Sequence, residues 1–215
     1  GTNSDFIHRE LVKEKVELLC AHGKGNAGYS IILDNLEHDR TILTYKGIND
    51  ELKFNEIPLK KLKTKWFYFC AMMNESFTTL EKLAEFAEEH KIKILFNPSS
   101  YLAEKGKLHL KHILSRTEIL ILNNEEACLL VGKEQMEELL PKLIEFGPKI
   151  AVITDGKNEL YAMDGKFIYR AKPTPAKAVD TTGAGDAFAS SFLSGIIRKN
   201  DVEFAIKLGI ANSVS

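Results

Sequence analysis

The chain has 215 residues, 44% of them hydrophobic, and it carries 29 basic and 30 acidic side chains. This length and this hydrophobic content are enough for one domain with a sizeable core, which excludes a disordered chain. A net charge of -1 excludes a global attraction to nucleic acid or to a membrane surface.

The cysteines and the first residues of the chain indicate the cellular compartment in which the protein is expected. Cys20, Cys70 and Cys128 are odd in number and far apart, which is typical neither of a disulfide framework nor of a metal site. The opening residues lack the apolar core of a signal peptide, and no apolar run approaches the length of a membrane span. We therefore expect a cytoplasmic protein with no nucleic-acid partner and no membrane partner.

The first part of the chain is expected to form a small β-sheet. Residues 5–13 have the apolar spacing of a short helix, and residues 16–21 are strand-like. Two β-branched runs, over residues 29–33 and 40–45, flank a polar turn, which is typical of an antiparallel hairpin. With the strand over 16–21 beside it, this hairpin makes residues 16–46 a small sheet.

From Trp66 onward strands alternate with helices. The run W-F-Y-F-C-A is continuously apolar, as in a strand that is buried on both faces of a parallel sheet. We expect strands over residues 93–96, 118–122 and 150–154, a hairpin through 160–162 and 167–169, and helices over 77–89, 107–114, 124–131, 133–146, from 186 onward, and 202–214. This alternation predicts an α/β fold with a doubly wound, mainly parallel sheet and ligands at the carboxyl ends of its strands.

Two glycines, Gly183 and Gly185, stand where the helix that carries Asp186 is expected to start. Glycines at such a place let the backbone turn and leave the first amides of the helix without partners, which creates a site for an anion. Asp186 can accept a proton there, or it can simply cap the helix. A dinucleotide fingerprint would need a further glycine where Phe188 stands, and the Gly-Lys-Ser/Thr of a P-loop is absent from the chain.

Two further strand ends carry polar residues. Asn123 and Glu126 follow the strand over 118–122 in an N-x-x-E arrangement, and this spacing alone favours a helix cap. Thr154 and Gly156 follow the strand over 150–154, where a glycine lets a ligand approach the backbone, although a hairpin turn has the same composition.

The segment Asp180–Asp186, D-T-T-G-A-G-D, resembles the signature of the ribokinase-like (PfkB) carbohydrate kinases and matches it at every fixed position. The resemblance implies a ribokinase-like fold, with Asp186 as the catalytic base. It also implies an anion hole formed by the amides of Gly183, Ala184 and Gly185. Asp180 and Thr182 would lie by the nucleotide phosphates and, in many members of the family, by a monovalent cation, K⁺.

The resemblance implies roles for the other strand ends too. Asn123 and Glu126 match the family's N-x-x-E motif, which positions Mg²⁺ near the phosphates of ATP. Thr154 and Gly156 match a segment beside the nucleotide, and Asn212 matches a segment near the adenine. Residues 16–46 match a β-sheet lid that closes over the sugar.

The activity implied is ATP-dependent phosphoryl transfer to a hydroxymethyl group of a small-molecule sugar or sugar-like substrate. A nucleoside kinase of the same superfamily, and a non-catalytic relative that binds a nucleotide or a protein partner, stay open at this point. A homodimer is compatible with the resemblance.

Measured against that family, the chain lacks an opening strand with a sugar-binding Asp, a G-G-x-x-x-N segment, and the C-terminal end beyond Ser215. We therefore expect residues 1–215 to be a ribokinase-like domain without those parts, either as a fragment or as a divergent member. On this expectation the chain alone binds nucleotide weakly, phosphorylates no sugar at an appreciable rate and self-associates.

Overall fold

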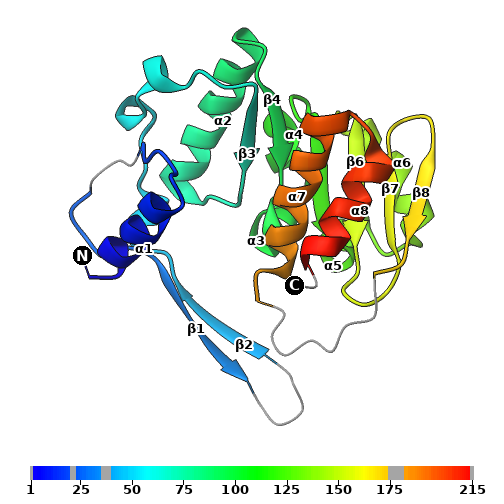
Figure 1. The fold of residues 1–215 in the computed structure, drawn as a ribbon, viewed down its shortest axis with the longest axis horizontal. Helices are drawn as coiled ribbons and strands as arrows, with labels where there is room; N and C mark the ends of the chain where they lie inside the picture. Colours follow the sequence, from blue (N-terminus) through cyan, green and yellow to red (C-terminus); the bar gives the residue numbers. More distant parts are fainter. Residues whose placement is uncertain (1, 20–22, 35–39, 174–181, 214–215) are drawn as a thin grey trace. The chain divides into compact units, whose positions relative to one another are not determined.

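A computed structural model of the protein describes residues 2–19, 23–34, 40–173 and 182–213 (Figure 1). The chain divides into two compact units. The first contains Gly1–Lys63 and Met72–Leu83, and the second contains Thr64–Ala71 and Ala84–Ser215. Helix α2, Asn74–Glu89, begins in the first unit and ends in the second.

The first unit contains helix α1 (Thr2–Lys13) and the antiparallel hairpin of β1 (Tyr29–Asp34) and β2 (Arg40–Tyr45). The predicted hairpin is therefore confirmed. Three short 3₁₀ helices follow it: η1 (Gly47–Asp50), η2 (Phe54–Glu56) and η3 (Leu59–Lys61). Two hydroxyl groups of α2 hold this segment, because Ser76 donates to the carbonyl of Asn49 at 2.7 Å and Thr79 donates to that of Leu52 at 2.7 Å.

The strand expected over residues 16–21 is wrong for residues 16–19, which form no strand; residues 20 and 21 lie outside the described residues. The reason is the way α1 ends. Lys15 has a left-handed backbone with φ 59°, and the amide of Val16 donates back to the carbonyl of Leu11 at 3.0 Å. Val16 therefore closes the end of the helix, and the small sheet has two strands in the part of the chain that the structure describes.

The second unit contains a six-stranded sheet with the order β3-β4-β5-β6-β7-β8. The first four strands are parallel: β3 (Trp66–Phe69), β4 (Lys93–Phe96), β5 (Ile119–Asn123) and β6 (Ile150–Thr154). Strands β7 (Leu160–Met163) and β8 (Ile168–Ala171) extend the sheet as an antiparallel hairpin. The mainly parallel α/β sheet predicted from the sequence is confirmed.

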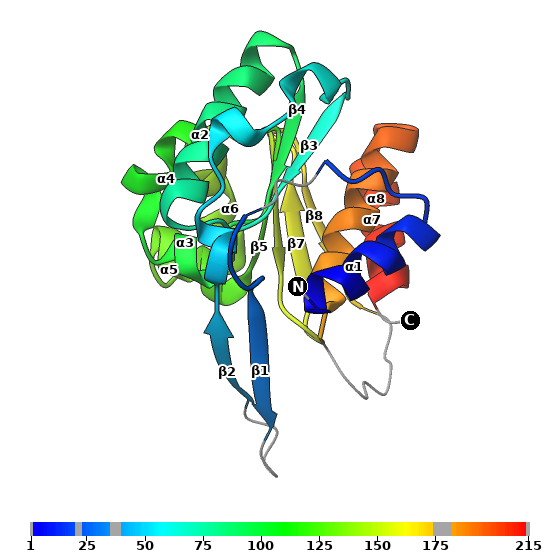
Figure 2. The same cartoon turned by 90° about the vertical axis from the view of Figure 1, so that its left-hand side faces the viewer.

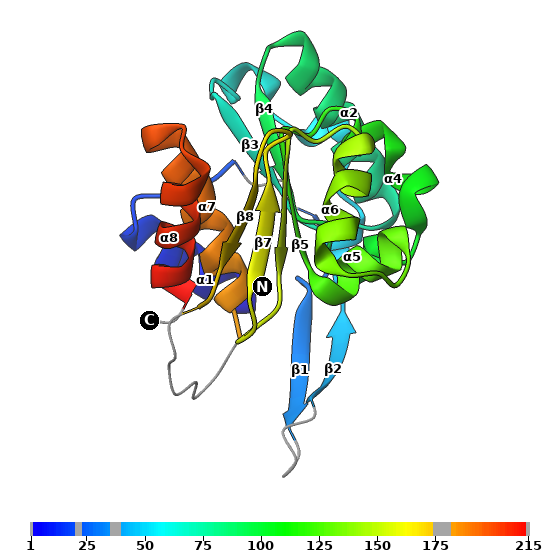
Figure 3. The same cartoon turned by 90° about the vertical axis from the view of Figure 1, so that its right-hand side faces the viewer.

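Helices cover both faces of this sheet (Figures 2 and 3). One face carries α3 (Ser99–Ala103), α4 (Gly106–Leu114), α5 (Asn124–Val131) and α6 (Met136–Glu145). The opposite face carries α7 (Ala184–Lys199) and α8 (Val202–Ser213). Helix α3 was not expected. None of the described helices is both long enough and apolar enough to cross a membrane.

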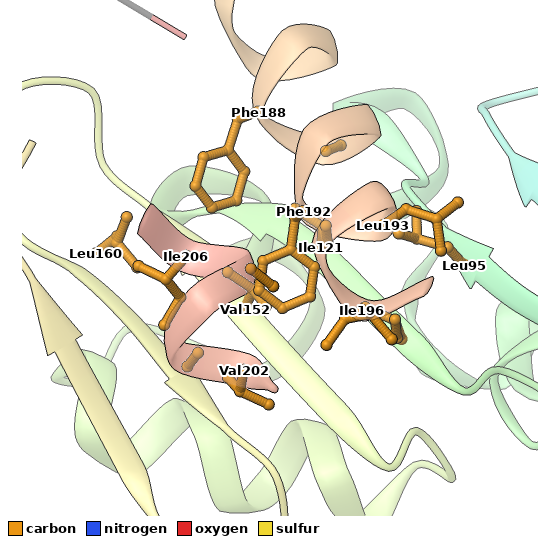
Figure 4. Packing of buried hydrophobic residues seen from close by; sticks show 14 of the residues in the cluster. Leu95, Ile121, Val152, Leu160, Phe188, Phe192, Leu193, Ile196, Val202 and Ile206 are labelled. Carbon is orange, nitrogen blue, oxygen red and sulfur yellow. The ribbon is translucent and has the colours of Figure 1, made fainter. Parts of the chain in front are cut away.

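The apolar face of α7 packs into a buried hydrophobic cluster together with residues of the sheet and of α8 (Figure 4). Phe188, Phe192 and Ile196 are buried against residues of the sheet such as Val152 and Leu160. Two glycines bring α7 and α8 close together: a Cβ on Gly195 would lie 2.6 Å from the Cα of Ala205, and a Cβ on Gly209 would lie 2.7 Å from the ring of Phe188. Helix α7 is therefore held firmly along its length by the sheet and by α8.

Candidate active site

Helix α7 starts on a glycine. Gly183 is its N-cap residue, with φ 83°, and no described side chain caps the helix there. The first amides of a helix have no acceptor within the helix, so those of Ala184, Gly185 and Asp186 are available to another partner. A Cβ placed on Gly183 or on Gly185 would meet no described atom within 4 Å. The start of α7 thus presents amide donors and the positive end of a helix dipole, with no described atom close in front of its two glycines.

Asp186 lies in the first turn of α7 and its side chain is exposed. Cys70 is exposed at the surface, but neighbouring atoms partly desolvate its thiol; this desolvation, and after it the negative charge of Asp186, raises the pKa of the thiol. Burial also raises the pKa of Tyr68 well above its usual value, and the charges of Cys70 and then Asp186 add to that effect. Tyr68 lies on β3 and Cys70 directly follows that strand, so the Asp186 carboxylate lies by the carboxyl end of β3.

Asn123 and Glu126 form a reciprocal cap at the start of α5. The side-chain oxygen of Asn123 accepts from the amide of Glu126 at 2.8 Å, and Oε2 of Glu126 accepts from the amide of Asn123 at 2.9 Å. The capping interpretation of N-x-x-E is therefore confirmed as geometry. It does not exclude a metal role, because a carboxylate has acceptor positions beyond the one that the cap uses.

The electrostatic environment of Glu126 is unusual for a carboxylate. Glu126 is buried, with 7% of its surface exposed. Burial raises the pKa of Glu126, the nearby Glu125 raises it further, and hydrogen bonds from Asn123 and Ser100 oppose these effects. Among the described residues, no lysine, arginine or histidine forms an ion pair with Glu126. Glu126 is thus a buried acid without an ion-pair partner in the described part of the chain.

Thr154 is brought next to Asn123 by the register of the sheet, in which these two residues are paired at the ends of β6 and β5. The hydroxyl of Thr154 lies 3.4 Å from the carbonyl oxygen of Leu122. Two residues later, Gly156 has φ 55°, and a Cβ on it would meet no described atom within 4 Å. The backbone at Gly156 is therefore open to a flat or bulky ligand, as its place after a strand predicts.

The remaining predicted residues are placed as follows. Asn212, on α8, donates its side-chain amide to the hydroxyl of Ser191 on α7 at 2.6 Å. Thr182 directly precedes Gly183 and is exposed. Asp180 lies outside the described residues.

Three residues at this edge of the sheet were missed by sequence reasoning: Tyr68, Cys70 and Ser100. All three belong to β3 or to the segments that follow β3 and β4, and the ends of neighbouring parallel strands meet at one edge of a sheet. The polar N-P-S-S segment after β4, residues 97–100, was the available signal.

Comparison with known proteins points to the same family as the motif at residues 180–186. The family model of the pfkB family carbohydrate kinases matches residues 1–214. An ATP-dependent 6-phosphofructokinase of Thermoanaerobacterium thermosaccharolyticum is 25% identical over 218 residues, which cover 97% of this chain and 67% of that protein. A cytidine kinase of Thermococcus kodakarensis is 34% identical over 164 residues, which cover 74% of this chain and 58% of that protein.

The fold has counterparts among solved structures. A ribokinase from Thermotoga maritima superposes with a TM-score of 0.85 at 20% identity, over 100% of this chain and 70% of that one. This likeness confirms the predicted ribokinase-like fold.

Proposed function

The chain belongs to the pfkB family of carbohydrate kinases, and on that premise we propose that it transfers the γ-phosphoryl group of ATP to a hydroxymethyl group of a sugar or sugar-like acceptor. The observation that carries this proposal is the start of α7, where the carboxylate of Asp186 stands in the first turn behind an open, glycine-capped row of amides.

The residues at the start of α7 match the needs of phosphoryl transfer. Asp186 accepts the proton of the acceptor hydroxyl while the oxygen of that hydroxyl forms a bond to the γ-phosphorus. The bond from that phosphorus to the oxygen bridging to ADP breaks, and ADP leaves with the electron pair. The amides of Gly183, Ala184 and Gly185 donate hydrogen bonds to the negative charge on the transferred group.

Mg²⁺ fits the surroundings of Glu126. No cluster of three or more acidic, histidine or cysteine side chains in the described part of the chain could hold a metal ion by itself. Mg²⁺ keeps several of its waters and commonly binds through one or two carboxylates and the phosphates of its substrate. Glu126, with Asn123 beside it, would hold the hydrated ion, which supplies positive charge to the phosphates when bound. Glu126 is buried and has no ion-pair partner among the described residues, which supports this assignment.

We assign the nucleotide to the edge formed by Thr154 and Gly156. Asp180 and Thr182 would lie beside its phosphates and beside a monovalent cation such as K⁺. Gly156 supports this, because its backbone is open to a ligand. Asn212 is the adenine-side candidate. Its side-chain amide also donates to the hydroxyl of Ser191, which joins α8 to α7.

A nucleoside acceptor is the second candidate, and the similarity to a cytidine kinase is the observation that favours it. A panel of sugars, including ribose and fructose 6-phosphate, tested beside cytidine and adenosine distinguishes the two classes by turnover. A non-catalytic relative would bind ATP and phosphorylate no acceptor in either panel.

The proposal is tested by Asp186→Asn. The amide keeps the shape of the side chain but cannot take a proton, so turnover should fall by roughly 10²- to 10⁴-fold while ATP binding is nearly unchanged. Asp201→Asn is the matched control, because Asp201 also lies at a helix start, where its carboxylate accepts from the amide of Phe204 at 2.7 Å, and asparagine caps equally well. Turnover of Asp186→Asn close to that of Asp201→Asn would show that Asp186 is not the base.

A further inference from the structure

Two aspartates of the chain are directly followed by glycine, and both stand in the same tripeptide. Asp-Gly-Lys occurs at residues 155–157, after β6, and again at residues 164–166, in the turn between β7 and β8. Both glycines have a left-handed backbone, with φ 55° at Gly156 and φ 81° at Gly165, and a Cβ on either would meet no described atom within 4 Å. The local sequence and the glycine backbone are therefore matched at the two sites.

An aspartate before a glycine can react with its own backbone. The amide nitrogen of the glycine attacks the carboxyl carbon of the aspartate, a C–N bond closes a five-membered succinimide ring, and the amide proton leaves with the carboxyl hydroxyl as water. Glycine favours this step, because it has no Cβ to hinder the nitrogen and its backbone adopts many conformations. Water then opens the ring at one of its two carbonyl groups, which gives back aspartate or gives isoaspartate, whose main chain is longer by one methylene group. One water is released and one is taken up, so no further reactant is needed.

The carboxylate of Asp164 is fixed by three hydrogen bonds. Its Oδ1 accepts from the amide of Lys166 at 3.0 Å and from that of Phe167 at 2.9 Å, and its Oδ2 accepts from the hydroxyl of Tyr169 at 2.9 Å. Partial burial acts to raise the pKa of Asp164, but these hydrogen bonds outweigh it and keep the pKa below its usual value. To close the ring, this carboxyl group must give up its hydrogen bonds and take a proton.

The carboxylate of Asp155 is held by much less. Within the described part of the chain, it accepts one hydrogen bond, from the side-chain amide of Asn158 at 3.0 Å. Asn158 is exposed, and its backbone amide donates to the carbonyl of Asp155 at 2.9 Å, which closes a turn around Gly156. A single contact with an exposed side chain is therefore all that must break before the Asp155 carboxyl group can turn toward the backbone.

We propose that Asp155 and Gly156 form a site of spontaneous isoaspartate formation, and that Asp164 and Gly165 are protected from the same reaction by the hydrogen bonds on the Asp164 carboxylate. The modified bond lies directly after β6, at the strand end to which the proposed function assigns the nucleotide. An added methylene group displaces the backbone of Gly156, so the modification lowers the affinity for ATP. Only this last consequence rests on the proposed function, because the difference between the two sites needs no ligand.

The test is incubation of the whole chain in neutral buffer at physiological temperature, followed by digestion with trypsin. Trypsin cleaves after lysine, so the two sites fall into separate peptides, residues 150–157 and 158–166, and liquid chromatography with mass spectrometry resolves the isoaspartate form of each. We expect isoaspartate to form roughly 10-fold faster at position 155 than at position 164, because two further hydrogen bonds must break at Asp164. Equal rates, or a faster reaction at position 164, would overturn the proposal.

Two controls separate the fold from the local sequence. In concentrated guanidinium chloride the hydrogen bonds of the fold are lost, and the two identical tripeptides should react at similar rates. A preference for position 155 that persists there would contradict protection by the fold. Tyr169→Phe removes one donor to Asp164 and should speed the reaction at position 164 by roughly 5-fold, with no change at position 155. An unchanged rate at position 164 would show that this hydrogen bond does not protect Asp164.

Incubation with ATP and Mg²⁺ tests the consequence for binding. At an ATP concentration of about ten times its Kd, only the free chain reacts, so isoaspartate formation at position 155 should slow by roughly 10-fold and that at position 164 should stay as it is. In calorimetry, the incubated wild type should lose ATP-binding sites. Asp155→Glu incubated in the same way should keep those that it had when fresh, because glutamate would have to close a six-membered ring, which forms far more slowly.

The outcomes distinguish the inference from the proposed function. A preference for position 155 that ATP does not slow confirms the modification site and overturns its link to ATP binding. If the wild type binds no ATP, the proposed function fails, and the comparison of positions 155 and 164 is still decided without a nucleotide. If ATP binds but the two positions react equally fast, only the inference about Asp155 fails.

Discussion

Helices α5 and α7 both start at the edge where the parallel strands of the sheet end, and their first turns are built in opposite ways. Asn123 and Glu126 close the start of α5 with two reciprocal hydrogen bonds from their side chains. Gly183 starts α7 with no cap from a described side chain, and a Cβ on it would meet no described atom within 4 Å. The first arrangement gives the first amides of α5 partners from its own residues, whereas the second leaves the first amides of α7 without an acceptor within the helix.

The comparison teaches where each helix obtains its stability. Helix α5 has only eight residues, Asn124–Val131, and its cap contributes directly to its formation. Helix α7 has sixteen residues, Ala184–Lys199, and the buried rings of Phe188 and Phe192 hold it to the sheet. A long, well-packed helix is stable without a side-chain cap, so the amides of its first turn can bind a ligand.

The largest loss of turnover is expected from Gly183→Ala, a change at the uncapped start of α7. An alanine at φ 83° costs about 1–2 kcal/mol of left-handed strain. Relaxation of that strain turns the amides of the anion hole away from the transferred group, and we expect turnover to fall by roughly 10²-fold. Steady-state kinetics and chemical denaturation measure the two quantities.

Gly165→Ala is the matched control for this change. Gly165 has φ 81°, and a Cβ on it would also meet no described atom within 4 Å, but it lies in the turn between β7 and β8. The two variants should lose similar free energies of unfolding, and only Gly183→Ala should lose turnover. Equal turnover in both would show that the amides at the start of α7 are not part of the site.

An intermediate effect on turnover is expected from Glu126→Gln. This change keeps the side-chain cap of α5 and removes its negative charge. The amide oxygen of glutamine can still accept from the amide of Asn123, so the free energy of unfolding should change little. Loss of the charge should raise the Mg²⁺ concentration for half-maximal turnover by roughly 10-fold.

Glu125→Gln is the control for the charge, because Glu125 is the neighbouring acid and is exposed. It should leave the Mg²⁺ dependence as it is. An unchanged Mg²⁺ dependence in Glu126→Gln, with reduced thermal stability, would leave Glu126 with a capping role alone.

The smallest effect on turnover is expected from Asn123→Ala. It removes the acceptor for the amide of Glu126 and should lower the free energy of unfolding by about 1 kcal/mol, the usual value of an N-cap. Asn123→Ser should restore most of the loss, since serine caps nearly as well. Chemical denaturation of the three proteins measures this, and an Asn123→Ala variant as stable as the wild type would show that the cap contributes nothing.

Local patterns predicted most of the fold. The strands over 93–96 and 150–154 and the helix over 124–131 were expected with the bounds that the structure has, because apolar runs and caps decide them within a few residues. The strand over 16–21 failed because Val16 is used to close α1. Helix α3 was missed because five residues after a proline carry no helical period.

The candidate site shows the same division between local and distant contacts. The bond between Asn123 and Glu126 was predictable, because both residues lie within one turn. The nearness of Asp186 to Cys70 joins elements that the chain brings together only on folding. Spacing in a single sequence carries no signal for such pairs.

The contact of Phe188 with Gly209 has a consequence for the motion of the molecule. The ring is only 4% exposed, and it fills the space where any side chain at position 209 would stand. A half-turn of this ring needs room that the closed helix pair does not offer, so each flip must wait for α7 and α8 to separate briefly. Because Phe188 is two residues from Asp186, the flip rate of its ring, measured from aromatic NMR lines, would report how often the helix that carries Asp186 separates from α8.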